Sequence, residues 1–269
     1  MRMIRKLLTG VAVLCAAMPF CFGQGSAFPA KARGTLRLMT YNVGAFGKSM
    51  EDSSPMVAAM IREAGADAVA LNELDSCNTR HAVFQAARLA EHLGGWRFAF
   101  RSAMPYAGGG YGCGLVCRDR IRRTFAIPIP RGDGSEPRVC VVAETRRYVI
   151  ASTHLDHVSE ASRVEGARRI AEALSARYGR SRKPVFLLGD MNAVPGSAPL
   201  RELEKHFTVL SGTDPSFPSD GPRVCIDYIL LLNNRAEVHR TAGAVCGTFA
   251  DGDVTVASDH RPVFVDVAR

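Results

Sequence analysis

A short apolar run that ends in polar residues constrains the fold more than any other segment of this sequence. Residues 185–188 are apolar, and Asp190 and Asn192 follow in a loop closed by Pro195 and Gly196. Four apolar residues bounded by turn-forming residues are typical of a buried strand. Because side chains two apart point the same way along a strand, Asp190 and Asn192 are predicted to project together from its end.

Two interpretations of this pair are open. Asp and Asn are common in turns, so both can be ordinary loop residues. A carboxylate that orients water, beside an amide that donates to an oxyanion, is also what hydrolysis requires. The rest of the chain has to separate the two interpretations.

The length and composition favour one domain. The chain has 269 residues, of which 47% are hydrophobic, which is enough for one large domain or two small ones. Neither a Gly/Ser/Pro-rich linker nor an internal repeat divides the sequence. We therefore expect a single α/β domain over residues 34–269.

The N-terminal segment has the pattern of a signal peptide. Three basic residues within the first six precede an apolar stretch at 7–22 that contains Pro19, and small residues follow at 23–27. The stretch is too short for a convincing membrane span, so we predict a signal peptide at 1–27 with cleavage near 23–27. An uncleaved anchor is the alternative, and lipid attachment at a cysteine is a weaker one. The prediction implies export to the periplasm, cell surface or medium.

The charge leaves the substrate open. The formal net charge of +8 becomes 8 − 3 = +5 once the signal peptide is removed. This moderate basicity suits an anionic substrate. However, the sequence shows no dense run of Lys and Arg with interleaved aromatic residues, which make up only 7% of the chain.

Polar side chains also stand at the ends of several other predicted strands. The residues concerned are Asn42 after 36–41, Glu73 after 68–71, His154 after 148–153, Asp227 near the start of 225–232, and Asp259 and His260 before 263–267. Helices are predicted at 54–63, 80–93, 159–178 and 197–205, and the strands at 111–118, 123–127, 138–144 and 148–153 are predicted to form an antiparallel meander. Oxygen ligands without cysteine suit magnesium, manganese or calcium.

Six blocks of sequence resemble the endonuclease/exonuclease/phosphatase superfamily, in particular its exported bacterial members. They occur in the family's order and span about residues 36–267. The blocks are Thr40-Tyr41-Asn42-Val43, Leu71-Asn72-Glu73-Leu74-Asp75, Ser152-Thr153-His154-Leu155-Asp156, Gly189-Asp190-Met191-Asn192, Ile226-Asp227-Tyr228 and Ser258-Asp259-His260-Arg261-Pro262-Val263.

The resemblance implies a fold and an activity. The fold is a four-layer α/β sandwich, in which two packed mixed β-sheets are flanked by helices. The activity is hydrolysis of a phosphate ester by in-line attack of an activated water, with Mg²⁺ or Mn²⁺ as cofactor and Ca²⁺ as an alternative. The substrate would be a nucleic acid, a phospholipid head group or a small phosphate. We expect a monomer with no obligate protein partner.

The resemblance also implies a role for each matching residue. Glu73 would bind the metal ion, with Asn42 beside it and Asp259 as a further ligand. Asp190 would hold and activate the water, and Asn192 would stabilise the pentavalent phosphate. His260 would act with Asp227, which fixes its tautomer, and His154 would donate to a phosphate oxygen.

Departures from the family pattern limit what is carried over. Asn72 stands where the family usually has Gln, which is expected to shorten a contact behind the metal site. The block at Asp227 lacks the Trp-Cys-Asp-Arg pattern of inositol polyphosphate 5-phosphatases, so that subclass is disfavoured. Arg163 either faces the phosphate or is a solvated helix charge. A catalytically silent binding module with the same fold is the alternative function.

Six cysteines lie beyond the signal peptide, and an even number in an exported protein can form disulfides. Cys77 and Cys225 each lie within four residues of a site candidate, and a disulfide between them is one hypothesis. No pair has the CxxC spacing, so we expect no structural zinc site.

Overall fold

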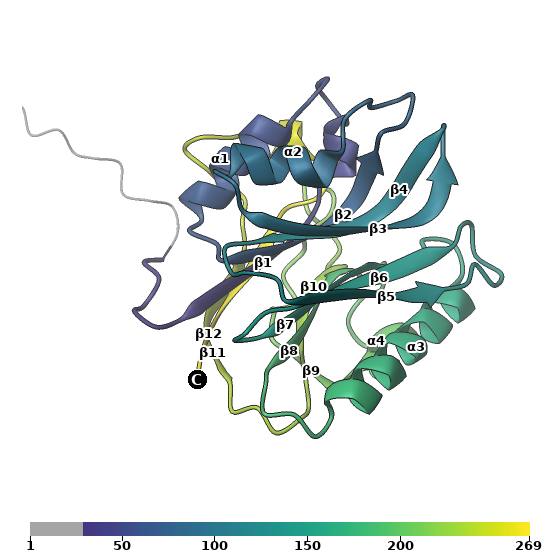
Figure 1. The fold of residues 1–269 in the computed structure, drawn as a ribbon, viewed down its shortest axis with the longest axis vertical. Coiled ribbons are helices and arrows are strands. Elements are labelled where there is room, and N and C mark those ends of the chain that lie inside the picture. The colour runs from purple at the N-terminus through teal and green to yellow at the C-terminus, as the bar shows by residue number, and fades with distance from the viewer. Residues whose placement is uncertain (1–28) are drawn as a thin grey trace, which may run out of the picture.

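Two six-stranded mixed β-sheets, packed face to face, form the centre of the structure, and helices cover their outer faces (Figure 1). The computed structural model describes residues 29–269. The predicted signal peptide at 1–27 lies outside the described residues. Within 29–269, no helix is long and apolar enough to cross a membrane. The predicted α/β sandwich of two packed mixed sheets is confirmed.

The first sheet has the strand order β11-β12-β1-β2-β4-β3. Only β1 and β2 are parallel, and α1 makes the crossover between them. The strands are β1 (Leu36–Asn42), β2 (Ala68–Ser76), β3 (Arg97–Tyr106), β4 (Gly109–Cys117), β11 (His239–Val245) and β12 (Val263–Ala268).

The second sheet has the strand order β5-β6-β7-β8-β10-β9. Here β7 and β8 are the parallel pair, and α3 makes the crossover. The strands are β5 (Arg123–Ile129), β6 (Arg138–Glu144), β7 (Val149–His154), β8 (Val185–Asp190), β9 (Phe207–Val209) and β10 (Asp227–Leu232).

The helices lie on the two outer faces. The first sheet is accompanied by α1 (Ser54–Glu63), α2 (Gln85–His92), α5 (Val254–Ala257) and the short 3₁₀ turn η1 (Gly44–Phe46), and the second by α3 (Glu160–Tyr178) and α4 (Ala198–Glu204). Each helix layer buries an apolar cluster against its sheet, and a third cluster fills the space between the sheets.

The alternation of side chains along each strand explains these three apolar layers. In β8, Phe186 and Leu188 pack between the sheets, whereas Val185 and Leu187 pack against the helices. Strands covered on both faces are expected to be continuously apolar, as residues 185–188 are. The run from which the sequence analysis starts is therefore a central, doubly buried strand.

The predicted four-strand meander is wrong in one respect. Strand β4 pairs with β2 and β3 in the first sheet, and only β5, β6 and β7 form an antiparallel meander in the second. The glycine-rich segment before β4 is a tight β3–β4 hairpin turn at Ala107 and Gly108, both with positive φ. A hairpin commits β4 to the sheet of β3, and the chain changes sheets only in the loop that follows.

The disulfide between Cys77 and Cys225 is also wrong. Cys77 follows β2 of the first sheet and is exposed, whereas Cys225 precedes β10 of the second sheet and is buried. All six cysteines of residues 29–269 are free thiols.

Candidate active site

The two parallel strand pairs end at the same edge of the sandwich, where they bring four predicted site residues together. Asn42 ends β1, His154 ends β7 and Asp190 ends β8. The Asn42 amide donates from Nδ2 to Asp190 Oδ2 at 3.1 Å and to Glu73 Oε1 at 2.9 Å, so one side chain joins both sheets. Its Oδ1 accepts from the Gly44 N–H at 3.1 Å. Asn42 therefore presents its NH₂ group to the carboxylates in this structure.

A β-bulge orients Glu73. The strand does not end at Leu71, as the sequence suggested, but continues to Ser76. The pairing of β2 with β4 shifts register between Leu71 and Leu74, and Glu73 has a φ of +58°. A non-glycine residue in this conformation is held there by its surroundings, and such strain is concentrated at functional sites. The bulge directs the Glu73 carboxylate to Asn42.

Asn72 ties the two sheets together directly behind the site. Its Oδ1 accepts from the Asp190 N–H at 3.0 Å, and its Nδ2 donates to the Thr153 carbonyl at 2.7 Å. The side chain is fully buried. Asn72 therefore fixes the ends of β7 and β8 directly behind the site through these two hydrogen bonds.

Asp190 and Asn192 converge by a turn rather than by strand alternation. The strand ends at Asp190, and Asn192 has a φ of +46°, so the extended geometry does not continue as the sequence suggested. The Asn192 N–H donates to Asp190 Oδ1 at 2.8 Å, and its side-chain amide donates to the Leu155 carbonyl at 3.0 Å. The same amide nitrogen lies 2.9 Å from His154 Nε2. Both residues therefore meet at His154.

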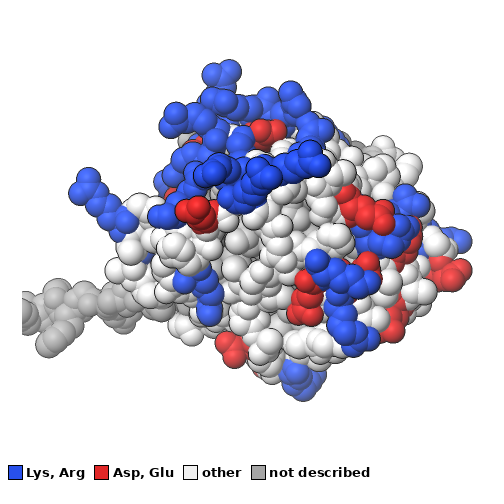
Figure 2. All heavy atoms as spheres, turned by 90° about the horizontal axis from the view of Figure 1, so that it is seen from below, with Lys and Arg blue, Asp and Glu red and all other residues white. Residues whose placement is uncertain are grey.

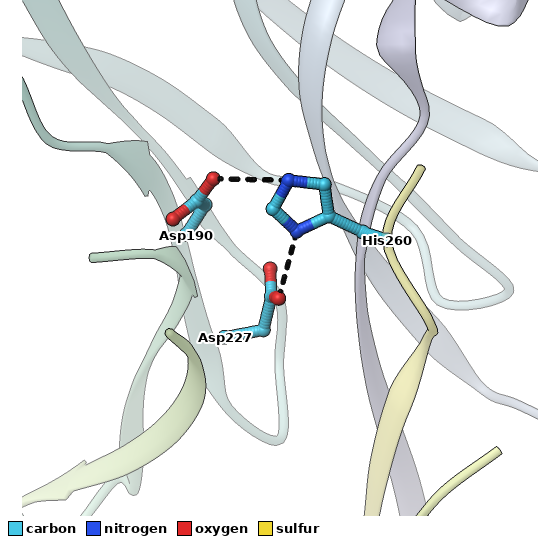
Figure 3. A group of neighbouring side chains, drawn as sticks. All are labelled: Asp190, Asp227 and His260. Atoms are coloured by element: carbon cyan, nitrogen blue, oxygen red, sulfur yellow. Dashed lines mark hydrogen bonds and ion pairs between the residues drawn. The ribbon is translucent and has the colours of Figure 1, made fainter. Parts of the chain in front are cut away.

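His260 lies between two buried carboxylates from the second sheet (Figure 3). Its Nδ1 lies 2.9 Å from Asp227 Oδ2, and its Nε2 lies 3.6 Å from Asp190 Oδ2. The Ser216 hydroxyl donates to Asp227 Oδ2 at 2.6 Å, and the Phe217 ring packs on the imidazole with centroids 4.8 Å apart. The predicted partnership of His260 with Asp227 is present as a hydrogen bond.

Burial and these neighbouring charges shift the pKa values of Asp190 and His260. Burial raises the pKa of Asp190 to about 7, the charge of Asp227 adds to the rise, and His260 partly offsets it. Burial alone would lower the pKa of His260, but the charge and hydrogen bond of Asp227, together with Asp190 and Asp259, raise it to about 10. His260 is therefore an imidazolium at neutral pH, while Asp190 titrates near neutrality.

Arg138 orients His154. This arginine is buried in β6 and donates from Nη1 to His154 Nδ1 at 3.2 Å. Burial, followed by the charge of Arg138, holds the pKa of His154 well below its usual range, so the ring is neutral. Its other ring nitrogen, Nε2, lies 3.3 Å from Asp190 Oδ2 and 2.9 Å from the Asn192 amide nitrogen. Arg138 and Asn192 therefore fix the orientation of the His154 ring from its two sides.

Lys48 holds the pair of carboxylates predicted to bind metal. Its ammonium lies 2.9 Å from Asp259 Oδ2 and 3.9 Å from Glu73 Oε2. Burial alone would lower the pKa of Lys48, but the hydrogen bond to Asp259 and the charges of both carboxylates raise it. The aliphatic chain lies over Gly44, where a Cβ would come within 2.4 Å of Lys48 Cγ. The missing side chain at Gly44 gives Lys48 its path into the site.

The donor set fits a hard divalent ion at Glu73 and Asp259. Two carboxylates that already hold a cation are the oxygen ligands such an ion prefers. A second group of ligand atoms, from Asp190, Asp227 and His260, lies within 4.8 Å of one another. In this structure the three side chains contact one another, with His260 Nδ1 2.9 Å from Asp227 Oδ2 and His260 Nε2 3.6 Å from Asp190 Oδ2.

The side chains open into two adjoining cavities. One, of about 270 Å³, is bordered by His154, Asp190, Asn192, Asp259 and His260. The other, of about 330 Å³, is bordered by Lys48, Arg80, His81, Met104 and Tyr106. Glu73, Tyr111 and Glu136 border both.

A family model matches residues 39–260 and describes the Endonuclease/Exonuclease/phosphatase family. The chain belongs to this family. Its members are phosphoesterases and nucleases, so the protein has a phosphoesterase fold. A search of curated protein sequences gives no significant match.

Solved structures share the fold at low identity. An endonuclease/exonuclease/phosphatase from Beutenbergia cavernae DSM 12333 is 23% identical, with a TM-score of 0.69 over 88% of this chain and 72% of that one. A mannosyl-6-phosphatase from Bacteroides thetaiotaomicron VPI-5482 is 17% identical, with a TM-score of 0.70 over 87% and 100%. The TDP2 of D. rerio, complexed with a single-strand DNA product, is 14% identical, with a TM-score of 0.66 over 87% and 99%.

Sequence reasoning missed two residues of the site and left a third undecided. Lys48 lies in a loop with no distinguishing pattern. Arg138 carries a weak signal, since it begins strand β6, whose next five residues are apolar. Arg163 turns back and donates to the Asp156 carbonyl at 3.1 Å, and it does not border either cavity.

Proposed function

We propose that the protein is a divalent-metal-dependent phosphoesterase that hydrolyses a phosphodiester or a phosphomonoester by in-line attack of water. The observation that carries the proposal is the convergence of Glu73, His154, Asp190, Asn192 and His260 on one cavity. These side chains come from both sheets but border the same cavity. Asp190 supplies a carboxyl group whose pKa lies near neutral pH, His260 supplies an imidazolium, and the others include neutral donors. Hydrolysis of a phosphate ester requires this combination.

Asp190 and His260 have different tasks in the proposed reaction. Asp190 accepts the proton of the attacking water, since a pKa of about 7 lets a carboxyl act as a base near neutral pH. His260 remains protonated, because its pKa is about 10, and its charge offsets the charge that develops on the phosphate. Asp227 keeps His260 in this state.

Neutral donors complete the phosphate site. His154 would donate to a phosphate oxygen, from a ring that Arg138 holds at Nδ1. Asn192 borders the same cavity and is positioned by its bonds to Asp190 and Leu155. Both donors are fixed by hydrogen bonds before the substrate arrives, which lowers the cost of reorganisation in the transition state.

Glu73 and Asp259 would hold Mg²⁺ or Mn²⁺, with Asn42 positioning Glu73. When bound, such an ion neutralises charge on the phosphate and on the leaving oxygen. The second cavity lies beside this carboxylate pair and would receive the remainder of the substrate. One structural neighbour is a mannosyl-6-phosphatase and another is complexed with DNA, which is why both ester classes stay within the proposal.

Turnover of two chromogenic esters tests the proposal. Bis-p-nitrophenyl phosphate reports diesterase and p-nitrophenyl phosphate reports monoesterase activity, each with Mg²⁺ or Mn²⁺ and again with chelator. Asp190→Asn and His260→Ala are expected to lose about 10²–10⁴-fold in kcat. Asp119→Asn and His206→Ala, which lie outside both cavities, are matched controls and keep full activity. Full activity in chelator, or in Asp190→Asn, would refute the mechanism.

We also propose that the protein is exported, on the basis of the signal-peptide pattern at 1–27. Fractionation of producing cells, followed by N-terminal sequencing, tests this. A mature N-terminus between residues 23 and 28 outside the cytoplasm is expected, and an intact N-terminus on cytoplasmic protein would contradict it.

A further inference from the structure

The end of the sandwich opposite the active site carries a dense group of arginines. Val149 and Val185 pair at the starts of β7 and β8, and both strands run from there to His154 and Asp190. At ~3.3 Å per residue, the two ends of these strands are roughly 15–20 Å apart. Charges at the start of the strands therefore lie well outside the catalytic cavity.

Three segments that are distant in sequence contribute to this group. They are the β4–β5 loop with the start of β5, the β6–β7 turn, and the C-terminal end of α3 with the residues that follow. We define the arginine face by six exposed side chains: Arg120, Arg122, Arg123, Arg146, Arg177 and Arg180. Figure 2 shows Lys and Arg gathered along one edge of the molecule with few acidic side chains among them, whereas other parts of this view mix both signs. Folding therefore gathers arginines from three separate segments into one basic surface.

Contacts hold the three segments together. The Arg122 N–H donates to the Glu144 carbonyl at 2.8 Å, and Lys183 Nζ lies 2.6 Å from Glu144 Oε1. The Arg177 guanidinium lies 4.6 Å from the centre of the Phe125 ring. The arginine face is therefore part of the folded framework rather than a set of independent loops.

Most of the arginine charge is not neutralised. The nearby carboxylates Asp119 and Glu144 are paired with Arg147 and Lys183, respectively. Within residues 29–269, no ion pair is formed by Arg120, Arg122 or Arg146, and these three border a hollow of about 520 Å³. Side chains of like charge kept together in this way repel one another, so the arrangement favours a polyanionic partner.

The N-terminal end of the described chain lies at the same end of the molecule. Pro29 and Lys31 border a shallow cavity with Arg118, which follows β4. Lys31 Nζ lies 2.9 Å from Asp67 Oδ2, and the Arg118 N–H donates to the Asp67 carbonyl at 2.9 Å.

We infer that the arginine face docks the protein on the phosphate head groups of an anionic membrane. Guanidinium groups bind phosphate oxygens in a planar, bidentate way, and a cluster of basic side chains is attracted to the negative surface of a membrane that contains anionic lipids. A membrane on this face leaves the catalytic cavity at the opposite end open to solvent. A nucleic acid is favoured less, because a strand bound here lies away from the cavity that would cut it. The inference does not depend on the proposed phosphoesterase activity.

Vesicle sedimentation with the full chain tests this inference. Partitioning is measured on phosphatidylcholine vesicles and on vesicles of equal parts phosphatidylcholine and phosphatidylglycerol. The ratio of the two partition coefficients cancels any contribution of the apolar residues 7–22, which is the same for both kinds of vesicle. We expect a preference for anionic vesicles of at least about tenfold that falls with salt. The variant Arg120→Gln/Arg122→Gln/Arg146→Gln should lose at least about tenfold of it, since each basic residue contributes roughly fivefold.

A matched variant controls for net charge. Arg88→Gln/Arg168→Gln/Arg169→Gln removes the same charge from α2 and the middle of α3, where the three arginines lie near glutamates, and should keep the preference. Circular dichroism and ester turnover should be unchanged in both variants. Equal preference in the two variants, or none in the wild type, overturns the inference. Binding of a DNA duplex that depends on the three arginines, without a vesicle preference, would assign the face to nucleic acid instead and overturn it as well.

Discussion

Replacing Lys48 with Met is expected to tighten the binding of a divalent ion at Glu73 and Asp259. The ammonium now satisfies both carboxylates, at 3.9 and 2.9 Å. A metal ion that binds these carboxylates has to displace the Lys48 ammonium or remain beside its positive charge. Both alternatives cost free energy of binding. Methionine keeps the length and flexibility of the side chain over Gly44 but removes the charge.

The exposure of the pair sets the magnitude. The side chains of Lys48 and Asp259 are each 38% exposed, so solvent screens the attraction strongly. Ion pairs of this kind contribute ~0.2–1 kcal/mol each, so leaving both carboxylates costs about 0.5–2 kcal/mol. At 1.4 kcal/mol per tenfold change, the affinity for the ion should rise about 2- to 30-fold. The metal ion can always displace the Lys48 ammonium, so the cost of this displacement is the upper limit of the gain in metal affinity.

Titration calorimetry with Mn²⁺ measures this affinity without relying on turnover. Arg80→Met is the matched control, since Arg80 borders the same cavity but is paired with Asp75. Gly44→Ala should act in the same direction as Lys48→Met, because a Cβ there would push the Lys48 chain aside. Unchanged or weaker Mn²⁺ binding in Lys48→Met would refute the competition, and no binding in any variant would refute the metal site itself.

Three further predictions concern the framework of the site and of the fold. Asn72→Ala leaves two buried backbone groups without their partners and should cost about 2–5 kcal/mol, seen as a lower urea midpoint with unchanged m-value. Asp227→Asn should lower the pKa of His260, measured by NMR titration of the imidazole. Because the pKa of His260 is raised from 6.5 to about 10 in the folded wild type, the stability that its charge contributes is lost as pH rises from about 6.5 to 10. The variant should lose less stability over this pH range. Asp266→Ala strips a buried, doubly hydrogen-bonded partner from Arg37 and should cost about 3–5 kcal/mol in thermal or urea unfolding.

Much of the site could be predicted because it lies where strands end. Asn42, His154 and Asp190 occupy the last positions of apolar strands, and the carboxyl ends of two parallel pairs meet at one edge. A polar residue after a strand that is buried on both faces can be recognised in the sequence, because the run of apolar residues stops there. The family resemblance then supplied the order of the blocks.

What could not be predicted depends on conformation or on register. Glu73 points into the site because of a bulge with positive φ, and no residue type in Leu71-Asn72-Glu73-Leu74 announces one. Lys48 enters the site only because Gly44 leaves room for it. The arginine face joins residues 120–123, 146 and 177–180, which are distant in sequence and become neighbours partly through the pairing of β5 with β6 and of β6 with β7.

The charge of the candidate site argues that the proposed phosphoesterase would need a further cation to bind its anionic substrate. Within residues 29–269, five carboxylates at or behind the first cavity are paired with three cationic groups. The carboxylates are those of Glu73, Glu136, Asp190, Asp227 and Asp259, and the cationic groups are those of Lys48, Arg138 and His260. With all five carboxylates ionised, two negative charges are in excess, and an anionic ester would be repelled. A divalent ion at Glu73 and Asp259 cancels this excess, and displacement of Lys48 by the ion frees an ammonium beside the cavity. Metal and substrate are therefore expected to bind cooperatively, because each supplies charge that the other lacks.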